Sequence, residues 1–506
     1  MDLKALGRNT LIYAVGNIGL RAVAFLLIPL YAHLLSQPDF GMLYTIFFTM
    51  QIMLVLMNLG VRESLVRFAS EAGRAGRMGT LLGSCLLVNL AGGALVTGAA
   101  MAFLLPFLGG LLHVENPGRY VLLASAITLA QVLTNQMLNY FRAINSALRF
   151  MAAGLCVAVA LVIANVLLLG VFHMGIIGAL VAQLIVYGLA FAVLAALILP
   201  RLGLGASRQV LRQVLAFGSP LVLSEFAWSV MIAVPAYFLS YHVGLAEVAT
   251  YSLGVRLAQV VTIVLILPFQ LAYAPYVFAH LDNAAIRQSM SRVLTYLVLA
   301  FGAVAFAVLT GSRFLVPLIV PAGYSGAVLV LLMMLPAVGF EALYAFSSTL
   351  LLIRRRSRVA GGLAVLAGGI SLGLNLALVP AFGLYGAILV VNLATGFMAL
   401  AVLIAGLRTY PLRLEVKRMT VGLAAFAGLG LLFLAAREAS PPAFIAAVVL
   451  PGLAVPVLLY VSGFFDPSEK RGIRDVLGRK ISFWRRPAAR PALPSRLAQV
   501  LPSDRV

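Results

Sequence analysis

Acidic residues and cysteines are scarce in this sequence. Its 506 residues include 15 aspartates and glutamates and two cysteines. Both cysteines, Cys85 and Cys156, lie in apolar stretches, so a disulfide framework is excluded and the redox compartment stays open. Charged residues of both signs make up only 10% of the chain, whereas soluble globular proteins carry about 25%. The composition therefore excludes an ordinary soluble domain.

The sequence also lacks the motifs of several chemistries. It has no Walker motif, which argues against ATP as the direct energy source. Its histidines lack the spacing of metal ligands, so we expect neither a metal site nor a bound cofactor; four of them stand near the expected outer ends of helices, at His33, His113, His173 and His242. No small-residue cleavage site follows the first apolar run, which we therefore expect to be retained as a helix.

Long apolar runs are abundant. Hydrophobic residues make up 63% of the chain, and the mean hydropathy is +1.07. A helix needs about 20 apolar residues to cross a bilayer. Fourteen segments meet this length, near 10–31, 40–60, 80–107, 119–140, 150–172, 174–199, 214–241, 247–278, 293–316, 325–352, 359–380, 383–407, 419–436 and 442–463. We therefore predict an all-α integral membrane protein with about 14 transmembrane helices.

The net charge of +21 lies mostly in short loops between the apolar segments. No basic domain carries interleaved aromatic residues, so we expect no nucleic-acid partner. If the N-terminus is cytoplasmic, only Arg119, Arg313 and Arg437 among the basic loop residues face the other side. The positive-inside rule then predicts that both termini are cytoplasmic.

The two halves of the chain resemble each other. GIIGALVAQL at 175–184 resembles GLYGAILVVN, which begins 208 residues later, and a fixed offset between similar segments indicates an internal repeat. Parallel repeats place a substrate site between two lobes. We predict two six-helix lobes at 1–212 and 213–412, two appended helices at 413–463 and a basic cytoplasmic tail at 464–506. The tail is either an interfacial amphipathic helix or a plain topology-fixing segment.

Four ionisable residues lie within the apolar segments: Arg21, Arg256, Glu225 and Glu341. A charge at mid-bilayer costs about 2.5–3.5 kcal/mol on insertion scales, so such residues face a partner or a wet cavity. Arg21 stands about 16 Å into its helix at 1.5 Å per residue, with Asn17 one turn earlier on the same face. Because the repeat places Arg21 within a turn of Glu225, we expect these charges to meet between the lobes.

Polar stripes on other helices extend the candidate site. Two guanidiniums suit an anionic substrate, because arginine stays charged and engages phosphate through a bidentate fork. The candidate substrate-binding residues are Asn17, Arg21, Gln51, Asn135, Arg256 and Tyr344. Glu225 and Glu341 are candidates for H⁺ or Na⁺ coupling or for gating. Alternatively, Arg21–Glu225 and Arg256–Glu341 are buried ion pairs that only hold the lobes together.

The opening of the chain resembles a known family. NTLIY at 9–13, Arg21 and FLLIPLYAHLLSQPDFGMLY at 25–44 are similar to the start of bacterial polysaccharide-unit flippases. These are O-antigen and exopolysaccharide transporters of the multidrug/oligosaccharidyl-lipid/polysaccharide exporter superfamily. The stretch from Asn165 to GIIGA and its copy from Asn375 to GLYGA look similar too, and the resemblance extends to about residue 463.

The resemblance implies two six-helix lobes around a central cavity in the bacterial cytoplasmic membrane. It implies movement of an undecaprenyl-pyrophosphate-linked oligosaccharide from the cytoplasmic to the periplasmic leaflet, with membrane lipids and a polysaccharide polymerase as further candidate partners. Related lipid II flippases place arginines of helices 1 and 8 in the cavity, and Arg21 and Arg256 match them. Their basic residues in helix 2 have no match here, which argues against lipid II; helix 2 offers Tyr44, Gln51 and Asn58. Asp39, in the PDFG motif at the outer mouth, is expected to have a structural or gating role.

Other functions remain open. An ion-coupled drug antiporter of the same superfamily would prefer an acid-dominated cavity, whereas here two arginines balance two glutamates. A membrane enzyme, such as an oligosaccharide polymerase or ligase, usually needs a sizeable outer loop, and no loop here is long enough. A channel fits the repeat less well than alternating access does. We therefore expect a secondary transporter rather than an enzyme.

Overall fold

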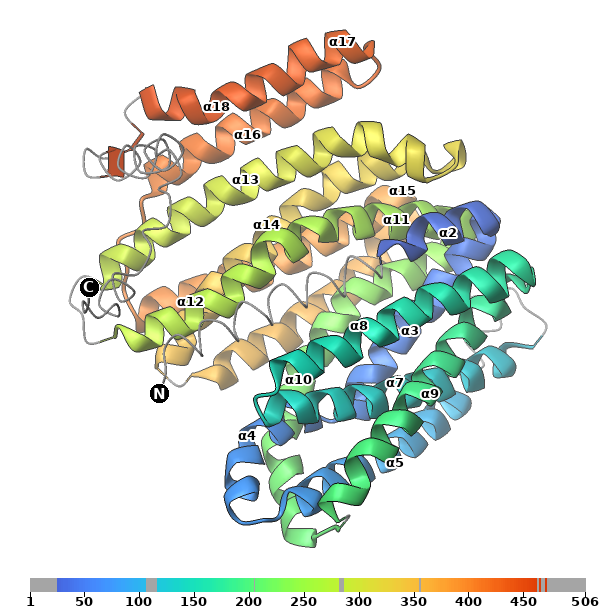
Figure 1. Ribbon diagram of the computed structural model, residues 1–506. Helices are drawn as coiled ribbons and strands as arrows, with labels where there is room; N and C mark the ends of the chain where they lie inside the picture. The colour runs from blue at the N-terminus through green and yellow to red at the C-terminus, as the bar shows by residue number, and fades with distance from the viewer. Residues whose placement is uncertain are drawn as a thin grey trace, which may run out of the picture. The chain divides into compact units, whose positions relative to one another are not determined.

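The computed structural model describes residues 25–105, 116–203, 205–281, 286–354, 356–461, 464–465 and 469–470. Within these ranges every regular element is a helix and no strand is present (Figure 1). Twelve of the described helices are long and apolar enough to cross a membrane. The prediction of an all-α integral membrane protein is thereby confirmed. Asn17, Arg21, most of the predicted first span and most of the tail lie outside the described residues.

The helices of the first half begin within the first predicted span. They are α2 (Leu27–Leu34), α3 (Gln37–Asn58), α4 (Val61–Arg74), α5 (Met78–Ala99), α7 (Pro117–Ala143), α8 (Ala147–Asn165) and α9 (Gly175–Leu202). Two π-helical turns continue them, η1 (Ala100–Leu104) after α5 and η2 (Val166–Val171) after α8. Each apolar run of this half that the structure describes has become a helix at the predicted place.

The second half continues in the same manner. Its helices are α10 (Arg208–His242), α11 (Leu245–Val261), η3 (Thr262–Ile266), α12 (Leu267–Ala279), α13 (Ile286–Ile319), η4 (Ala322–Tyr324), α14 (Ala327–Ile353), α15 (Ser357–Thr409) and α16 (Val416–Ala436). The long α15 joins two predicted spans, which meet at a kink where Gly383 has a φ of 55° and a ψ of −127°. Only glycine adopts such a conformation without strain, so the sequence itself marks this junction.

Contacts divide the chain into two compact units, residues 1–437 and 438–506. In the second unit the described helices are α17 (Pro441–Phe444), η5 (Ile445–Val449) and α18 (Leu450–Val461). Both candidate lobes therefore fall within the first unit. The lobe boundaries near residues 212 and 412 stay a prediction.

Helix α3 has a well-defined start. Ser36 is its N-cap: the Ser36 hydroxyl accepts the backbone N–H of Asp39 at 3.2 Å and donates to the Asp39 carboxylate at 2.6 Å. This reciprocal pairing satisfies a donor that the helix cannot satisfy itself. Asp39, expected to be structural or gating, thus stabilises the first turn of α3.

Helix α3 also joins the two halves of the first unit, because it packs against α7 on one side and against α10 and α11 on the other. At Gly41 any Cβ would collide with the backbone carbonyl of Leu245 on α11. At the other end a Cβ on Gly218 of α10 would lie 2.6 Å from the backbone oxygen of Leu59. Since helices in a bilayer associate through close packing rather than through the hydrophobic effect, these two approaches hold the halves together.

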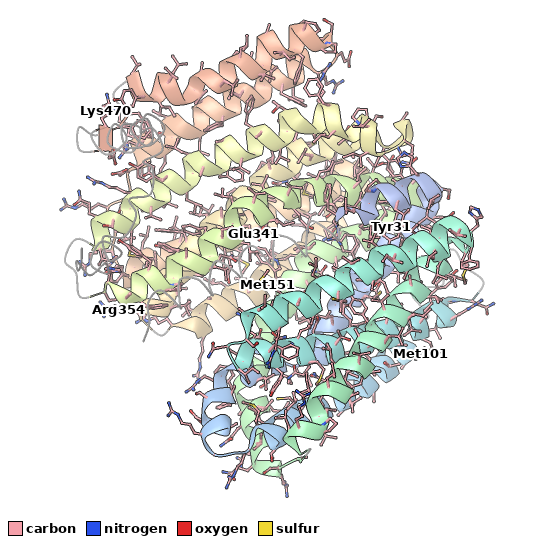
Figure 2. The ribbon with its side chains drawn as sticks, in the orientation of Figure 1. Tyr31, Met101, Met151, Glu341, Arg354 and Lys470 are labelled. Atoms are coloured by element: carbon pink, nitrogen blue, oxygen red, sulfur yellow. The ribbon has the colours of Figure 1, made fainter. Side chains whose placement is uncertain are left out.

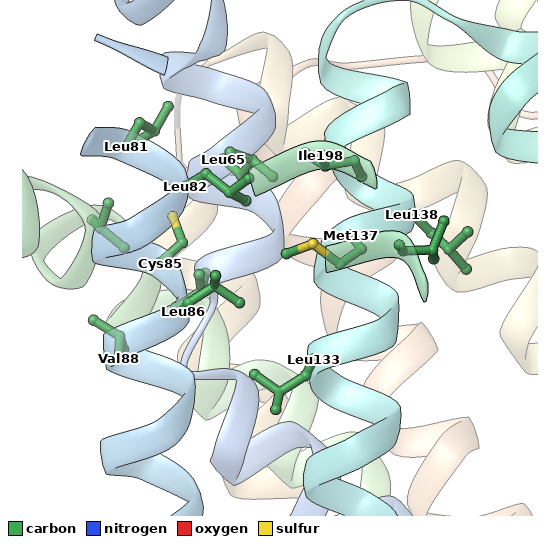
Figure 3. Close-up of a cluster of buried hydrophobic side chains, with 13 residues drawn as sticks. Leu65, Leu81, Leu82, Cys85, Leu86, Val88, Leu133, Met137, Leu138 and Ile198 are labelled. Carbon is green, nitrogen blue, oxygen red and sulfur yellow. The ribbon is translucent and has the colours of Figure 1, made fainter. Parts of the chain in front are cut away.

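A buried apolar cluster lies between α4, α5, α7 and α9, with Val214 of α10 beside them (Figure 3). Leu82, Cys85 and Met137 are completely buried there, with Leu133 and Ile198 beside them. Cys85 behaves as a small apolar side chain in this setting. The cluster fixes the positions of α7 and α9, the two helices that supply one wall of the cavity described next.

Candidate substrate cavity

A cavity of about 430 Å³ lies within the first unit. It is lined by side chains from both predicted lobes. The lining helices are α2, α3, α7, α8 and α9 of the first lobe and α11 with η3 of the second. Its polar lining residues are Tyr31, Tyr44, Gln51, Gln131, Gln183, Tyr187, Arg256 and Gln259. Among the described lining residues there is one basic side chain and no carboxylate.

Arg256 is the charged group among the described lining residues of this cavity. Its guanidinium stands over the ring of Tyr44, 5.5 Å from the ring centroid, and its Nη1 donates to Gln259 Oε1 at 3.1 Å. Tyr44 comes from α3 and Arg256 from α11, so the cation–π contact crosses between the halves. A guanidinium has five donors, and the bond to Gln259 leaves others for an incoming anion.

Phenols and amides form the rest of the polar lining. Tyr31, labelled in Figure 2, donates its hydroxyl proton to Asn165 Oδ1 at 2.9 Å. Between α7 and α9, Gln131 Nε2 donates to the hydroxyl of Tyr187 at 3.3 Å. Such side chains both donate and accept hydrogen bonds, which is what the hydroxyl groups of a sugar require. The cavity therefore combines a fixed positive charge with neutral polar walls.

Hydrogen bonds connect the predicted outer end of α3 to the second half of the unit. Gln37 Nε2 lies within donor distance of three acceptors: Ala246 O at 3.3 Å, Thr250 Oγ1 at 3.2 Å and Gly323 O at 3.3 Å. These acceptors belong to α11 and η4, so Gln37 clamps α3 to the second half of the unit.

An aromatic stack runs from this clamp toward the cavity. The rings of Tyr324 and Phe40 are 5.3 Å apart, and those of Phe40 and Tyr44 are 4.5 Å apart. All three residues are buried, and Tyr44 is also the ring beneath Arg256. The stack thus fills the space between the cavity and the outer end of α3.

Glu225 lies at the other end of α3, away from the cavity lining. Its Oε1 is 3.5 Å from Nη2 of Arg62, while Arg62 Nε donates to Glu63 Oε1 at 2.6 Å. The Arg62 and Glu225 side chains are 47% and 40% exposed, so the contact is a weak surface-type ion pair. The alternative pairing of Glu225 with Arg21 involves a residue outside the described ranges and stays a prediction.

Glu341, labelled on α14 in Figure 2, faces a π-helical turn of α11. Its Oε2 accepts a hydrogen bond from Thr262 Oγ1 at 2.9 Å. Thr262 begins η3, and π-helical turns inside membrane helices are frequent at functional positions. The described contacts of Arg256 are with Gln259 and Tyr44, and the alternative pairing of Arg256 with Glu341 stays a prediction.

Two other sequence candidates stand apart from the cavity lining. The ring of Tyr344 stacks on Trp228 with centroids 5.8 Å apart, beside a buried cluster of α10 and α15. Asn135 is half-buried, and its backbone carbonyl accepts from the Asn139 side chain at 2.8 Å. The cavity thus brings Gln51 and Arg256 together, whereas it includes neither Tyr344 nor Asn135.

The polar lining includes Tyr31, Gln183 and Tyr187, which we did not single out from the sequence. Gln183 and Tyr187 stand four residues apart on α9 in an otherwise apolar run, a spacing that places them on one face. This spacing is the sequence feature from which the polar face of α9 could have been predicted. No group of three or more metal-ligating side chains occurs within the part of the chain that the structure describes.

Comparisons with known proteins agree with this architecture. A family described as "Polysaccharide biosynthesis protein" matches residues 6–282, while no curated protein matches the chain. The chain is similar to an inward-facing multidrug resistance MATE-family transporter of the MOP superfamily, with 13% identity, a TM-score of 0.60 and coverage of 82% of this chain and 96% of that one.

Two further solved structures show the same similarity. A mutant of the Vibrio cholerae MATE transporter VcmN has 18% identity and a TM-score of 0.59, over 81% of this chain and 97% of that one. A MOP-superfamily transporter from Pyrococcus furiosus has 14% identity and a TM-score of 0.58, over 82% and 96%. At these identities the similarity establishes the fold alone, and that fold is the one of MOP-superfamily transporters.

Proposed function

The chain belongs to the polysaccharide biosynthesis protein family, and from this premise we propose that it is a flippase for a lipid-linked oligosaccharide. Its substrate is an undecaprenyl-pyrophosphate-linked unit of a cell-surface polysaccharide such as O-antigen or exopolysaccharide. The protein moves it from the cytoplasmic to the periplasmic leaflet of the bacterial inner membrane without covalent change. Both termini are cytoplasmic, and a polysaccharide polymerase receives the product.

The observation that carries this proposal is the polarity of the cavity. Arg256 is its basic side chain, and no carboxylate accompanies it among the described lining residues. A pyrophosphate is doubly charged and accepts paired hydrogen bonds, which a planar guanidinium supplies. The tyrosines and glutamines of the walls suit sugar hydroxyls. Asn17 and Arg21, from the first predicted helix, complete the headgroup site in this proposal.

Transport by alternating access requires that the cavity open to each leaflet in turn. The Gln37 clamp and the Phe40–Tyr324 contact close the predicted outer end, so both must separate before the sugar leaves. Glu225 and Glu341 are the proposed coupling residues for H⁺ or Na⁺. Glu341 is the better placed of the two, because it binds Thr262 at the turn that follows the Arg256 helix.

A drug antiporter of the same superfamily is the competing proposal, since two of the three structural neighbours described above are MATE transporters. A cationic drug requires negative charge in its binding cavity, and the described lining supplies a cation instead. The neighbour from Pyrococcus furiosus is itself described as having a binding pocket of reverse polarity. The charge of the cavity therefore favours an anionic substrate.

Purified protein in vesicles tests the proposal. A lipid-linked oligosaccharide with a terminal galactose is placed in the vesicles, and an impermeant galactose oxidase reports how much of it reaches the outer leaflet. We expect wild-type protein to equilibrate the lipid between leaflets, and mass spectrometry to recover it chemically unchanged. Equal movement of the lipid with and without protein, or a change in its covalent structure, would contradict the proposal.

A further inference from the structure

A second and larger cavity, of about 640 Å³, lies between α13, α14 and α16 in the first unit. None of its lining residues has a side-chain nitrogen or oxygen; Phe301, Phe340, Phe426 and Leu335 are typical of them. Protein interiors are close-packed, and apolar cavities that stay free of water take up apolar molecules. We therefore expect a hydrocarbon chain to occupy a cavity of this size within a membrane helix bundle.

The cavity is long and narrow. Its lining runs from Leu294 to Leu309 on α13 and from Met419 to Leu434 on α16, which at 1.5 Å per residue is about 22 Å along each helix. The two helices run parallel, because their contacts rise in step along both: Thr295 with Glu415, Gly302 with Phe426 and Arg313 with Ala436. Half of the hydrocarbon core of a bilayer is about 15 Å thick. An acyl chain from one leaflet therefore fits lengthwise.

The cavity opens toward the surrounding lipid along α16. Leu423 and Leu431 line it, yet their exposed fractions are 49% and 68%. Ala427, one turn from each, also lines the cavity and is exposed. These residues belong to a helix of membrane-spanning length, so a chain can enter sideways from the bilayer.

One end of the cavity is strongly basic. Lys417 and Arg418 directly precede the lining residue Met419, and Arg292 stands two residues before Leu294. Glu415 joins α13 to α16 here, because its Oε2 accepts from Thr295 at 2.9 Å and from Arg418 at 2.8 Å. Among the described residues of this end the acid Glu415 is outnumbered by basic residues: Arg287, Arg292, Arg413, Lys417 and Arg418. Basic pockets between membrane helices bind anionic lipid headgroups.

We propose that this cavity binds an anionic phospholipid of the surrounding membrane, with one acyl chain between α13, α14 and α16 and its phosphate beside Lys417 and Arg418. The lipid is a structural ligand and not the transported substrate. It fills the space between α16 on one side and α13 and α14 on the other, so it holds α16 in place. The proposal is independent of the transport function, and its test needs no transport assay.

Native mass spectrometry of the purified full-length protein tests the site. The protein is delipidated and then offered an equal mixture of phosphatidylglycerol and phosphatidylcholine with identical acyl chains. We expect one retained phospholipid per chain, with phosphatidylglycerol preferred about fivefold or more, since each basic residue near the headgroup contributes about 1 kcal/mol. Lys417→Gln, an exposed position outside the cavity lining, should reduce this preference while phospholipid is still retained.

Ala427→Phe fills the opening, and its matched control is Ala424→Phe, an exposed alanine of the same helix that does not line the cavity. We expect lipid retention to fall severalfold in Ala427→Phe and to stay at the wild-type level in Ala424→Phe. Equal retention in the two variants, or equal affinity of the wild type for the two headgroups, would overturn the proposal. Displacement of phosphatidylglycerol by an equimolar amount of undecaprenyl phosphate would also overturn it, because the occupant would then be a polyprenyl chain.

Discussion

Replacement of Arg256 tests whether its guanidinium binds the pyrophosphate of the substrate in the polar cavity. In Arg256→Gln the substrate pyrophosphate loses its charged donor among the described lining residues. A hydrogen bond to a charged group contributes about 1.5–3 kcal/mol. We therefore expect binding to weaken by about 2–3 kcal/mol, which corresponds to about 30- to 150-fold in the dissociation constant.

Arg256→Lys separates charge from shape. Lysine keeps the positive charge but loses the planar fork and stacks less well on Tyr44, which stands 5.5 Å from the guanidinium carbon in the wild type. Lysine presents a point charge where arginine gives a bidentate contact, so we expect an intermediate loss of about tenfold, or 1.4 kcal/mol. An apolar replacement of Tyr44 should reproduce only the stacking part of this loss.

The assay is the binding of a short-chain, pyrophosphate-linked oligosaccharide to purified protein, measured by calorimetry alongside the thermal stability of each variant. Arg313→Gln is the control. Arg313 lies on α13, outside the cavity lining, and its Nη1 donates to the backbone carbonyl of Ala436 on α16 at 3.2 Å. Wild-type affinity in Arg256→Gln, or an equal loss in Arg313→Gln, would refute the assignment of Arg256 to the headgroup.

Three further predictions follow from the contacts around α3 and α14. A cysteine pair at Gln37 and Gly323, in a background without the exposed native cysteine and joined by a short, cleavable thiol cross-linker, should stop transport until the linker is cleaved, because the Gln37 amide lies 3.3 Å from the carbonyl of Gly323; cross-linked protein with full flipping activity would exclude opening at this end. Gly41→Val should lower the unfolding free energy by about 1–3 kcal/mol, measured as a drop in melting temperature, since a side chain there collides with the backbone of α11. Thr262→Val removes the hydrogen bond to Glu341, worth about 1 kcal/mol, so the H⁺ or Na⁺ concentration for half-maximal flipping should shift severalfold, and an unchanged concentration dependence would remove Glu341 from the coupling role.

The fold was largely predictable because the bilayer imposes one simple rule on the chain. Apolar runs of about 20 residues must become helices in hydrocarbon, and the run at 383–407, for example, was separable from its predecessor by Gly383. The sequence underestimated how far helices continue. The predicted spans 40–60 and 80–107 place Arg62 in the loop between them. In the structure the chain turns at Leu59 and Gly60, both with positive φ, and α4 begins at the next residue.

The candidate site was predictable only in part, because spacing identifies a face of a helix but not what that face meets. Gln51 and Arg256 both line the cavity, in keeping with the tendency of polar groups in apolar runs to face a wet or polar environment, and their role in substrate binding stays a prediction. Tyr344 sits on a similar stripe, yet the packing of α10 against α15 brings Trp228 onto its ring instead. The pairing of Arg62 with Glu225 joins residues 163 positions apart, and no local pattern in either segment indicates it.

The most direct measurement is a structure of the protein bound to its undecaprenyl-pyrophosphate-linked oligosaccharide. We expect the diphosphate to lie within hydrogen-bonding distance of the Arg256 guanidinium, with the first sugars between Tyr31, Gln51 and Tyr187. A diphosphate located outside this cavity, with Arg256 still bound only to Gln259, would contradict this expectation.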